Sequence, residues 1–245
     1  MSAPRRNFVA DMTWKDVAER LSDGAYAILP IGAGAKEHGW HMPMATDQVQ
    51  AEYFAERLTE NINGIIWPTV TYGHYPAFVA YAGSVSISND TFEALVGEIA
   101  KGIAEFGARE IIILNTGLST IAPVERALSR LSARARHLKI YSGPRYCRAV
   151  KTLGRQSHGS HADENETSIM LAIAPDRVDM TRAADSPPLC GGTSIGPLNP
   201  SDASSENFSA SGSFGQPSLA SLENGRVFVQ AILEDMLDGL SATQA

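Results

Sequence analysis

The chain has 245 residues, of which 44% are hydrophobic and 19% are charged, and its formal net charge is −7 at pH 7. This length can bury a full core, and the acidic balance argues against nucleic acid as a partner. No basic segment leads into an apolar one at the N-terminus, no apolar run approaches the ~20 residues of a membrane span, and the two cysteines make no CxxC pair. We therefore expect a cytoplasmic protein without disulfides and without a membrane segment.

Short apolar runs alternate with helix-like segments along the chain. We expect strands at residues 25–31, 64–68, 110–115 and 138–142, and helices at residues 47–58, 90–106, 122–131, 164–174 and 219–240. Such alternation is typical of a mostly parallel sheet with helices on both faces. The prediction is a single three-layer α/β/α domain over residues 1–245, in which residues 1–9 form a flexible tail.

Residues 191–215 are rich in Ser, Gly, Pro and Asn and have few long apolar side chains. This composition fits either a flexible linker or a long ordered loop over a site. The segment does not mark a domain boundary, because only one further helix is expected after it.

The first segment with candidate site residues follows the strand expected at residues 25–31. Gly32 interrupts the apolar run, and Glu37, His38, His41 and Asp47 come next. Active sites of open α/β sheets lie where strands end. Imidazole and carboxylate groups suit zinc, and also manganese or iron. The segment therefore predicts either a site for a divalent metal or an ordinary polar loop.

A second segment combines histidines with carboxylates over residues 158–168. His161 and Glu164 are three residues apart, so a helix that begins here would place them on one face, whereas Glu166 would point elsewhere. The alternative is a first helical turn rich in acids, which complements the helix dipole.

Two further segments could form the walls of a pocket. Residues 111–120 read as a buried strand that ends in a turn of small residues, which include Ser119. Residues 72–86 are an aromatic loop that contains His74. Both fit a plain turn or core packing as well, so His74 and Ser119, together with His41, are candidate substrate contacts.

Taken together, these segments resemble the creatininase (creatinine amidohydrolase) family. Residues 30–47 resemble its first motif, Pro-Val-Gly-Ser-x-Glu-Gln-His-Gly-Pro-His-Leu-Pro-Leu-x-Thr-Asp, and residues 161–168 resemble its His-Ala-Gly-Glu-x-Glu-Thr-Ser. Residues 72–86 and 211–225 resemble its Tyr-Gly…Phe-Pro-Gly-Thr loop and its Gly-x-x-Gly-Asp-Pro…Ala-Ser…Gly segment. The likeness extends in order over about residues 10–240.

The resemblance implies one α/β domain, a two-metal site bridged by a carboxylate, and hydrolysis of a non-peptide C–N bond, often in a cyclic amide or formamide. It also implies a homo-oligomer, commonly a hexamer. By position, His38, Asp47 and Glu164 match metal ligands of the family. His161 matches the residue that carries protons to the leaving nitrogen, and Glu166 matches an acidic position beside it.

The sequence departs from the family pattern at residues that would hold one of the two metals. The family's Glu-x-His is here Glu37-His38, so Glu37 can aim differently from the usual ligand, and Gly117 replaces a histidine ligand. We therefore expect one or two divalent ions per chain (zinc, manganese or iron), with a single ion as the working hypothesis. Lys36 could supply the missing positive charge or be a solvated surface lysine, and His41 could be a substitute ligand.

The favoured function is a metal-dependent amidohydrolase acting on a small amide, cyclic amide or formamide. In this reading Glu37, His38, Asp47 and Glu164 bind metal, and His161 and Glu166 are catalytic. One alternative is a degenerate family member that binds a small molecule or partner without turnover. Another is an enzyme acting on a different bond, since a fold does not determine chemistry.

Overall fold

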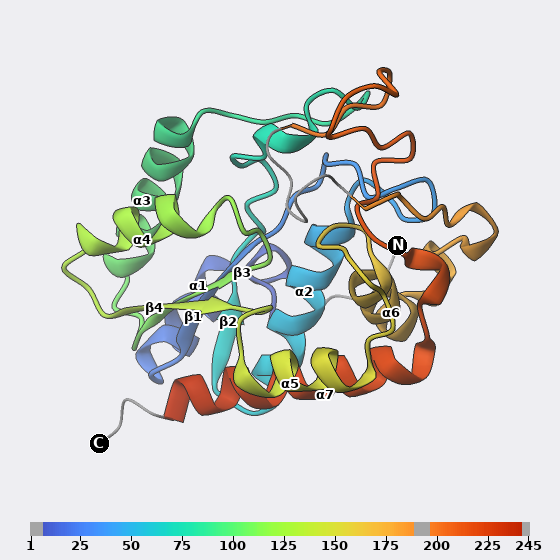
Figure 1. Ribbon diagram of the computed structural model, residues 1–245. Helices are drawn as coiled ribbons and strands as arrows, with labels where there is room; N and C mark the ends of the chain where they lie inside the picture. The colour runs from blue at the N-terminus through green and yellow to red at the C-terminus, as the bar shows by residue number, and fades with distance from the viewer. Residues whose placement is uncertain (1–6, 189–196, 242–245) are drawn as a thin grey trace.

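The computed structural model describes residues 7–188 and 197–241 of the chain. Within these residues, the apolar runs form a four-stranded parallel sheet in the order β2-β1-β3-β4 (Figure 1). The strands are β1 Tyr26–Ile31, β2 Gly64–Ile66, β3 Ile111–Asn115 and β4 Ala135–Lys139. The fold predicted from the sequence is confirmed.

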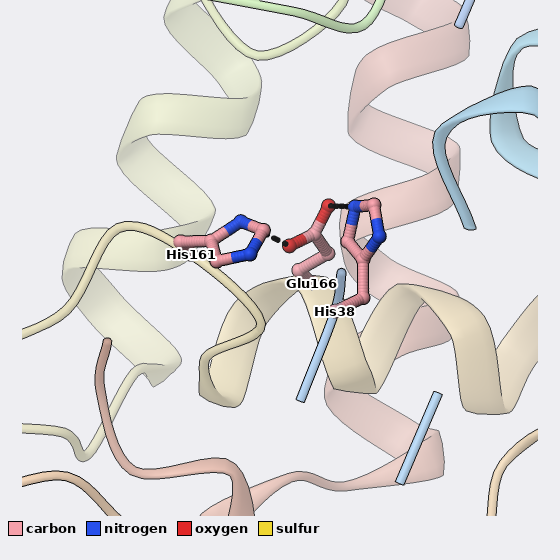
Figure 2. A group of neighbouring side chains, drawn as sticks. All are labelled: His38, His161 and Glu166. Atoms are coloured by element: carbon pink, nitrogen blue, oxygen red, sulfur yellow. Dashed lines mark ion pairs between the residues drawn. The ribbon is translucent and has the colours of Figure 1, made fainter. Parts of the chain in front are cut away.

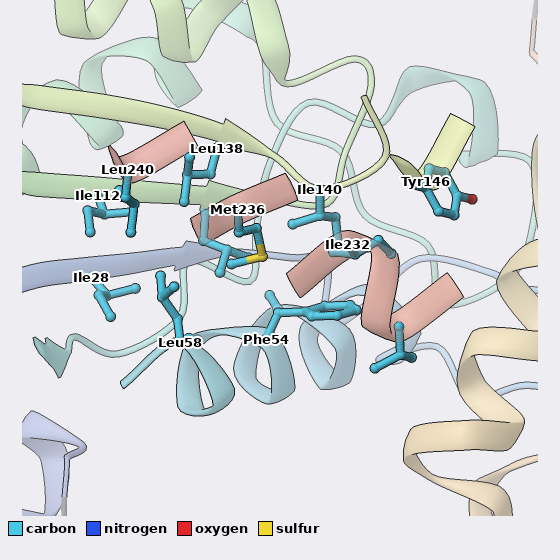
Figure 3. Packing of buried hydrophobic residues seen from close by; sticks show 14 of the residues in the cluster. Ile28, Phe54, Leu58, Ile112, Leu138, Ile140, Tyr146, Ile232, Met236 and Leu240 are labelled. Atoms are coloured by element: carbon cyan, nitrogen blue, oxygen red, sulfur yellow. The ribbon is translucent and has the colours of Figure 1, made fainter. Parts of the chain in front are cut away.

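Helices cover both faces of this sheet, because successive strand residues point to opposite sides. Ile28 and Ile112 point to one face, where they pack with side chains of α2 and α7 (Figure 3). Leu29 and Ile113 point to the other face and pack with α3 and α4. The arrangement is a three-layer α/β/α sandwich.

The first face is covered by α2 (Thr46–Thr59), α5 (Pro144–Leu153), α6 (Glu164–Ile173) and α7 (Leu222–Ser241), and the second by α3 (Asn89–Ala104) and α4 (Ile121–Ser129). A further helix, α1 (Trp14–Ser22), precedes β1 and begins at a capping box formed by Thr13 and Asp16. Short 3₁₀ turns lie at Val9–Asp11, Pro76–Phe78, Pro175–Arg177, Met180–Arg182 and Pro217–Leu219. None of the described helices is both long enough and apolar enough to cross a membrane.

Three expectations about the elements need correction. The last strand is β4 at residues 135–139 rather than at 138–142, and α1 and α5 form where no helix was expected. The N-terminal segment is also part of the fold from residue 7 onward. Phe8 is buried and forms a parallel bridge with Ile66, so the expected flexible tail does not include residues 7–9. Residues 1–6 lie outside the described residues.

Residues 191–215 were expected to be either a flexible linker or a long ordered loop over a site. The described part of this segment, residues 197–215, is an ordered loop. Residues 197–215 contain no helix or strand, yet Leu198 and Phe214 are buried. Phe214 forms an antiparallel bridge with His161, and Asn199 forms a parallel bridge with Phe208. This loop therefore packs on the end of the sheet where the site residues gather. Residues 191–196 lie outside the described residues.

The site is built where β1 and β3 end side by side. Ile31 pairs with Asn115 as the last register position of the two parallel strands, so the loops that follow both strands leave from one edge of the sheet. The N-terminus of α2 returns to the same edge. At Gly32 an added Cβ would overlap the backbone of Asp47, so the absence of a side chain lets the start of α2 lie directly against the end of β1.

Candidate metal centre

Three side chains from distant parts of the sequence converge at this edge. His38 comes from the loop after β1, His161 from the segment before α6, and Glu166 from the first turn of α6. Figure 2 shows the Glu166 carboxylate between the two imidazole rings, with one oxygen toward each ring. Glu166 Oε1 lies 3.7 Å from His38 Nε2, and Glu166 Oε2 lies 3.9 Å from His161 Nδ1.

Local structure at the start of α6 explains why Glu166 points into this group. The helix begins at Glu164, and the Asp163 side chain caps it by accepting hydrogen bonds from the backbone N–H of Asn165 and Glu166. Ala162, just before the cap, has a φ of +46° and donates its N–H to Glu166 Oε2 at 2.8 Å. His161 is therefore outside the helix, and the spacing rule for residues on one helical face does not apply to it.

The contacts of His38 give its two ring nitrogens different roles. Its Nδ1 lies 2.9 Å from the backbone carbonyl oxygen of Lys36, which can only accept, so Nδ1 carries a proton. In the neutral ring, Nε2 then presents a lone pair toward Asp47 Oδ1 at 3.2 Å and Glu166 Oε1 at 3.7 Å. An imidazole whose other nitrogen donates to a carbonyl is the usual form of a histidine ligand.

This arrangement fits a divalent cation. His38, His161 and Glu166 each offer one ligand atom, and these atoms lie within 4.8 Å of one another. Asp47 Oδ1 lies 3.2 Å from His38 Nε2 and adds a further carboxylate oxygen. Such a set of nitrogen and oxygen atoms suits zinc and manganese in particular. The residues present are therefore compatible with the metal that was expected from the sequence.

Glu37 is held by His161. Its Oε1 lies 2.7 Å from His161 Nε2, and its Oε2 accepts the backbone N–H of Gly39 at 2.9 Å. Burial alone would lower the pKa of His161, but the charge and hydrogen bond of Glu37 outweigh burial and raise it. Burial alone would raise the pKa of Glu37, and His161 lowers it in turn. The two side chains form a buried ion pair.

The long loop makes room for this ion pair. Gly212 has a φ of +88°, and an added Cβ at this position would overlap the carboxylate of Glu37. A residue with a side chain at this position would be strained by its backbone and would also displace Glu37.

Lys36 is a buried member of the site, which excludes the surface alternative. Its side chain is only 8% exposed, and Nζ lies 2.7 Å from Asp47 Oδ2. Burial alone would lower the pKa of Lys36, but the carboxylates of Asp47, Glu166 and Glu37 raise it overall. Burial alone would raise the pKa of Asp47, and Lys36 and His38 hold it well below its usual value.

Glu164 is directed away from this group. Its side chain is fully buried, and Oε2 accepts the backbone N–H groups of Arg155 and Gln156 at 2.7 Å and 2.6 Å. The carboxylate thus ties the end of α5 to the start of α6. Between the two glutamates, the geometry places Glu166 rather than Glu164 beside the histidines.

The three candidate substrate contacts occupy different environments. Ser119 lines a cavity beside the site and donates its hydroxyl to the carbonyl oxygen of His74 at 2.6 Å. His74 is partly buried, with Nδ1 3.1 Å from the carbonyl oxygen of Ile87. His41 is buried with Nε2 2.8 Å from Thr167 Oγ1, and burial lowers its pKa to about 4.

A cavity of about 440 Å³ opens beside the group. Lys36, Asp47, His161 and Glu166 contribute its charged and titratable walls, together with Asp163. The remaining walls are largely aromatic or small side chains: Tyr75, Pro76, Ala77, Phe78, Thr116, Gly117, Leu118, Ser119, Tyr141, Tyr146, Gly159, Ser160, Asn165, Leu198 and Phe214. The aromatic loop at residues 72–86 and the turn after β3 both contribute, as their sequences suggested.

Sequence reasoning missed two features of this site. Phe214 contacts the segment of His161 from the far end of the chain. The family resemblance of residues 211–225 marked this stretch but gave Phe214 no role. Tyr141 donates its hydroxyl to Gln50 Oε1, and Gln50 Nε2 lies 3.5 Å from Glu166 Oε1. Tyr141 follows β4 and Gln50 lies on the buried face of α2, so only the bounds of these two elements could have indicated their place in the site.

The sequence is similar to those of known hydrolases. The family described as creatinine amidohydrolase matches residues 10–240 of the chain. A creatinine amidohydrolase of Pseudomonas putida is 25% identical over 253 residues, which cover 95% of each chain. A mycofactocin precursor peptide peptidase of Mycobacterium tuberculosis (strain CDC 1551 / Oshkosh) is 25% identical over 228 residues, which cover 85% of this chain and 81% of the relative. The names of both relatives describe hydrolases.

A solved structure agrees with the fold. A mutant creatininase of the Zn-Zn type superposes with a TM-score of 0.80 at 24% sequence identity, over 96% of this chain and 97% of the other. Since the family match extends over most of the sequence and the folds agree, the chain belongs to the creatininase family.

Proposed function

We propose that this protein is a metal-dependent amidohydrolase that cleaves a C–N bond in a small amide, cyclic amide or formamide. The observation that carries the proposal is the grouping of His38, His161 and Glu166, whose ligand atoms lie within 4.8 Å of one another. His38 Nε2 also lies 3.2 Å from Asp47 Oδ1, and His161 is ion-paired with Glu37. The family names of the two relatives support hydrolysis, and the donor atoms support a metal.

We assign His38, Asp47 and Glu166 as the residues that hold the ion. Bound there, a divalent ion would polarise a carbonyl group and lower the pKa of water, which is the chemistry that amide hydrolysis needs. Lys36 keeps Asp47 charged, and the carbonyl of Lys36 keeps the lone pair of His38 directed at the site. These contacts hold the ligands in place before any substrate enters.

His161 is suited to donate a proton to the leaving nitrogen. Its Nε2 is committed to Glu37, so the proton on Nδ1 is the one available on the side of Glu166 and the cavity. Glu37 stabilises the protonated ring, which keeps a proton on His161 until the C–N bond breaks. A well-placed general acid contributes about 10²–10⁴ in rate.

The cavity indicates the size and chemistry of the substrate. Its volume of about 440 Å³ lies in the range of sites for small molecules. Tyr75, Phe78 and Phe214 offer flat apolar surfaces, while the charged groups lie together at Lys36 and Glu166. A compact ring or planar amide fits such walls, with its polar edge toward the charged groups.

Turnover of a substrate panel tests this proposal. The enzyme, loaded with zinc or manganese, is incubated with cyclic amides, formamides, linear amides and short peptides, and the amine released is measured. His161→Asn keeps a polar side chain but cannot carry the proton, so we expect kcat to fall by about 10²–10⁴ while KM changes little. His158→Asn is the matched control, since His158 Nε2 lies 2.9 Å from the carbonyl oxygen of Ser186.

Two outcomes would change the conclusion. Full activity of His161→Asn would remove the proton-donor role. A metal-loaded protein that hydrolyses nothing in the panel would favour the alternative of binding without turnover. Cleavage of the short peptides alone would place its substrate class with that named for the mycobacterial relative.

We further propose that the protein assembles into a homo-oligomer. Large apolar side chains are exposed around the cavity segments, at Trp40, Tyr72, Val79 and Leu118. Such side chains are often covered by neighbouring subunits. Light scattering coupled to gel filtration tests this, and a monomer at micromolar concentration would contradict it.

A further inference from the structure

The two carboxylate oxygens of Asp47 face two different positions. Oδ1 lies 3.2 Å from His38 Nε2, where we place the metal ion. Oδ2 lies 2.7 Å from the ammonium group of Lys36. A carboxylate whose two oxygens each face a cation is the arrangement that bridges two metals, and here one of the two positions is filled by Lys36.

Aromatic rings and burial hold the ammonium group in this position. Lys36 Nζ lies 4.8 Å from the centre of the Phe78 ring and 5.6 Å from that of Tyr75, distances at which a cation is attracted to the ring face. The backbone carbonyl of the same residue orients His38. Lys36 therefore anchors one metal ligand while its side chain neutralises another.

Among the described residues, two that the family pattern would assign to a second metal are not available as ligands. Glu37 is committed to His161 and Gly39, and Gly117 has no side chain. An added Cβ at Gly117 would lie 2.6 Å from Thr120 Oγ1 and 3.4 Å from the Tyr75 ring, so this space is already filled. Among the residues that the structure describes, Asp47 is the sole ion-pair partner of Nζ.

We propose that the ammonium group of Lys36 permanently occupies the second cation position of this site, so that the protein binds a single divalent ion. The inference rests on the proposed function, because it takes His38, Asp47 and Glu166 as the ligands of that ion. Since Lys36 also lines the cavity, its remaining N–H groups are available to an oxygen atom of the substrate.

The fixed charge has a measurable consequence for metal binding. A lysine ammonium beside the site repels the incoming ion and competes with it for the charge of Asp47. Removal of that charge should therefore strengthen binding at the remaining position. Because the pair is buried, the repulsion is less screened than it would be at the surface.

Titration of the metal-free full chain with Mn²⁺ tests the inference without any substrate. Free Mn²⁺ is counted by electron paramagnetic resonance, which gives both stoichiometry and affinity. We expect one ion per chain in the wild type and at least about tenfold tighter binding in Lys36→Met. Lys36→Arg keeps the charge and should stay close to the wild type. Lys101→Met, which removes an exposed lysine from α3, is the matched control.

The outcomes separate this inference from the proposed function. No binding by the wild type would overturn both. Two equivalents in the wild type would overturn the lysine inference and leave the hydrolase proposal intact, as would unchanged or weaker binding in Lys36→Met. If Lys36→Met does not fold, the wild-type stoichiometry decides, because a second equivalent refutes the inference on its own.

Discussion

Replacement of Gly212 by alanine tests whether the long loop controls the ion pair of the site. The left-handed backbone, with φ at +88°, costs a residue with a side chain about 1–2 kcal/mol. The new Cβ would also overlap the Glu37 carboxylate and displace it from His161. Loss of that charge-assisted hydrogen bond costs about 1.5–3 kcal/mol. The free energy of unfolding should therefore fall by roughly 2.5–5 kcal/mol in Gly212→Ala.

Two assays follow this change. Urea denaturation gives the loss in stability. Nitrogen-15 NMR of the imidazole rings gives the second readout, because Glu37 raises the pKa of His161 in the wild type. When the carboxylate moves away, burial is less opposed, and the pKa of His161 should fall.

Gly102→Ala is the control for the loss of a glycine. Gly102 lies inside α3, and no heavy atom lies within 4 Å of an added Cβ there. Alanine should stabilise this helix by about 0.5–1 kcal/mol, the opposite sign to Gly212→Ala. If Gly212→Ala instead leaves both the stability and the pKa of His161 unchanged, the loop does not hold Glu37 in place and the reasoning is wrong.

Three further predictions concern the ligands, the pH response and the sheet edge. Glu166→Gln should weaken metal binding at least about tenfold. Glu164→Gln should bind metal normally but lose stability, because its backbone hydrogen bonds are weakened. If titration calorimetry shows weaker metal binding in Glu164→Gln than in Glu166→Gln, Glu164 is the ligand. Burial, aided by Lys139, lowers the pKa of His137 from 6.5 to about 4. The unfolded chain therefore binds more protons between these values, and stability decreases as the pH is lowered. This group should cost about 2 kcal/mol between pH 7 and pH 5; His137→Gln should flatten that slope in urea titrations, and an unchanged slope would contradict the assignment. Arg136→Met leaves the buried Glu110 carboxylate unpaired and should lower the free energy of unfolding by about 3–5 kcal/mol. The double variant Arg136→Met/Glu110→Met should recover most of this loss. A double variant as unstable as the single one would show that the unpaired carboxylate is not the cause.

The central part of the fold follows directly from the sequence. β1 and β3 are continuous apolar runs because both faces of a central parallel strand are buried. β4 was expected three residues too late because it lies at the edge of the sheet. Its sequence, Ala-Arg-His-Leu-Lys, has only one buried residue, Leu138, so no apolar run marks it.

The composition of the site was also predictable, but its geometry was not. The two segments that combine histidines with carboxylates, residues 37–47 and 158–168, lie together in the structure. The choice between Glu164 and Glu166 depended on where α6 begins, and the cap at Asp163 leaves His161 outside the helix. The burial of Lys36 depended on its pairing with Asp47, which sequence spacing does not reveal.

The Lys36–Asp47 ion pair gives the Asp47 carboxylate a counter-charge that does not depend on a metal ion. Asp47 is fully enclosed, and a carboxylate there with no counter-charge would oppose folding. Because the lysine comes with the chain itself, the counter-charge is present as soon as the loop after β1 meets α2. Small zinc domains gain their fold from the ion and unfold when it is withdrawn. In this protein, we therefore expect a newly made chain to complete its fold without the proposed ion and to acquire that ion afterwards.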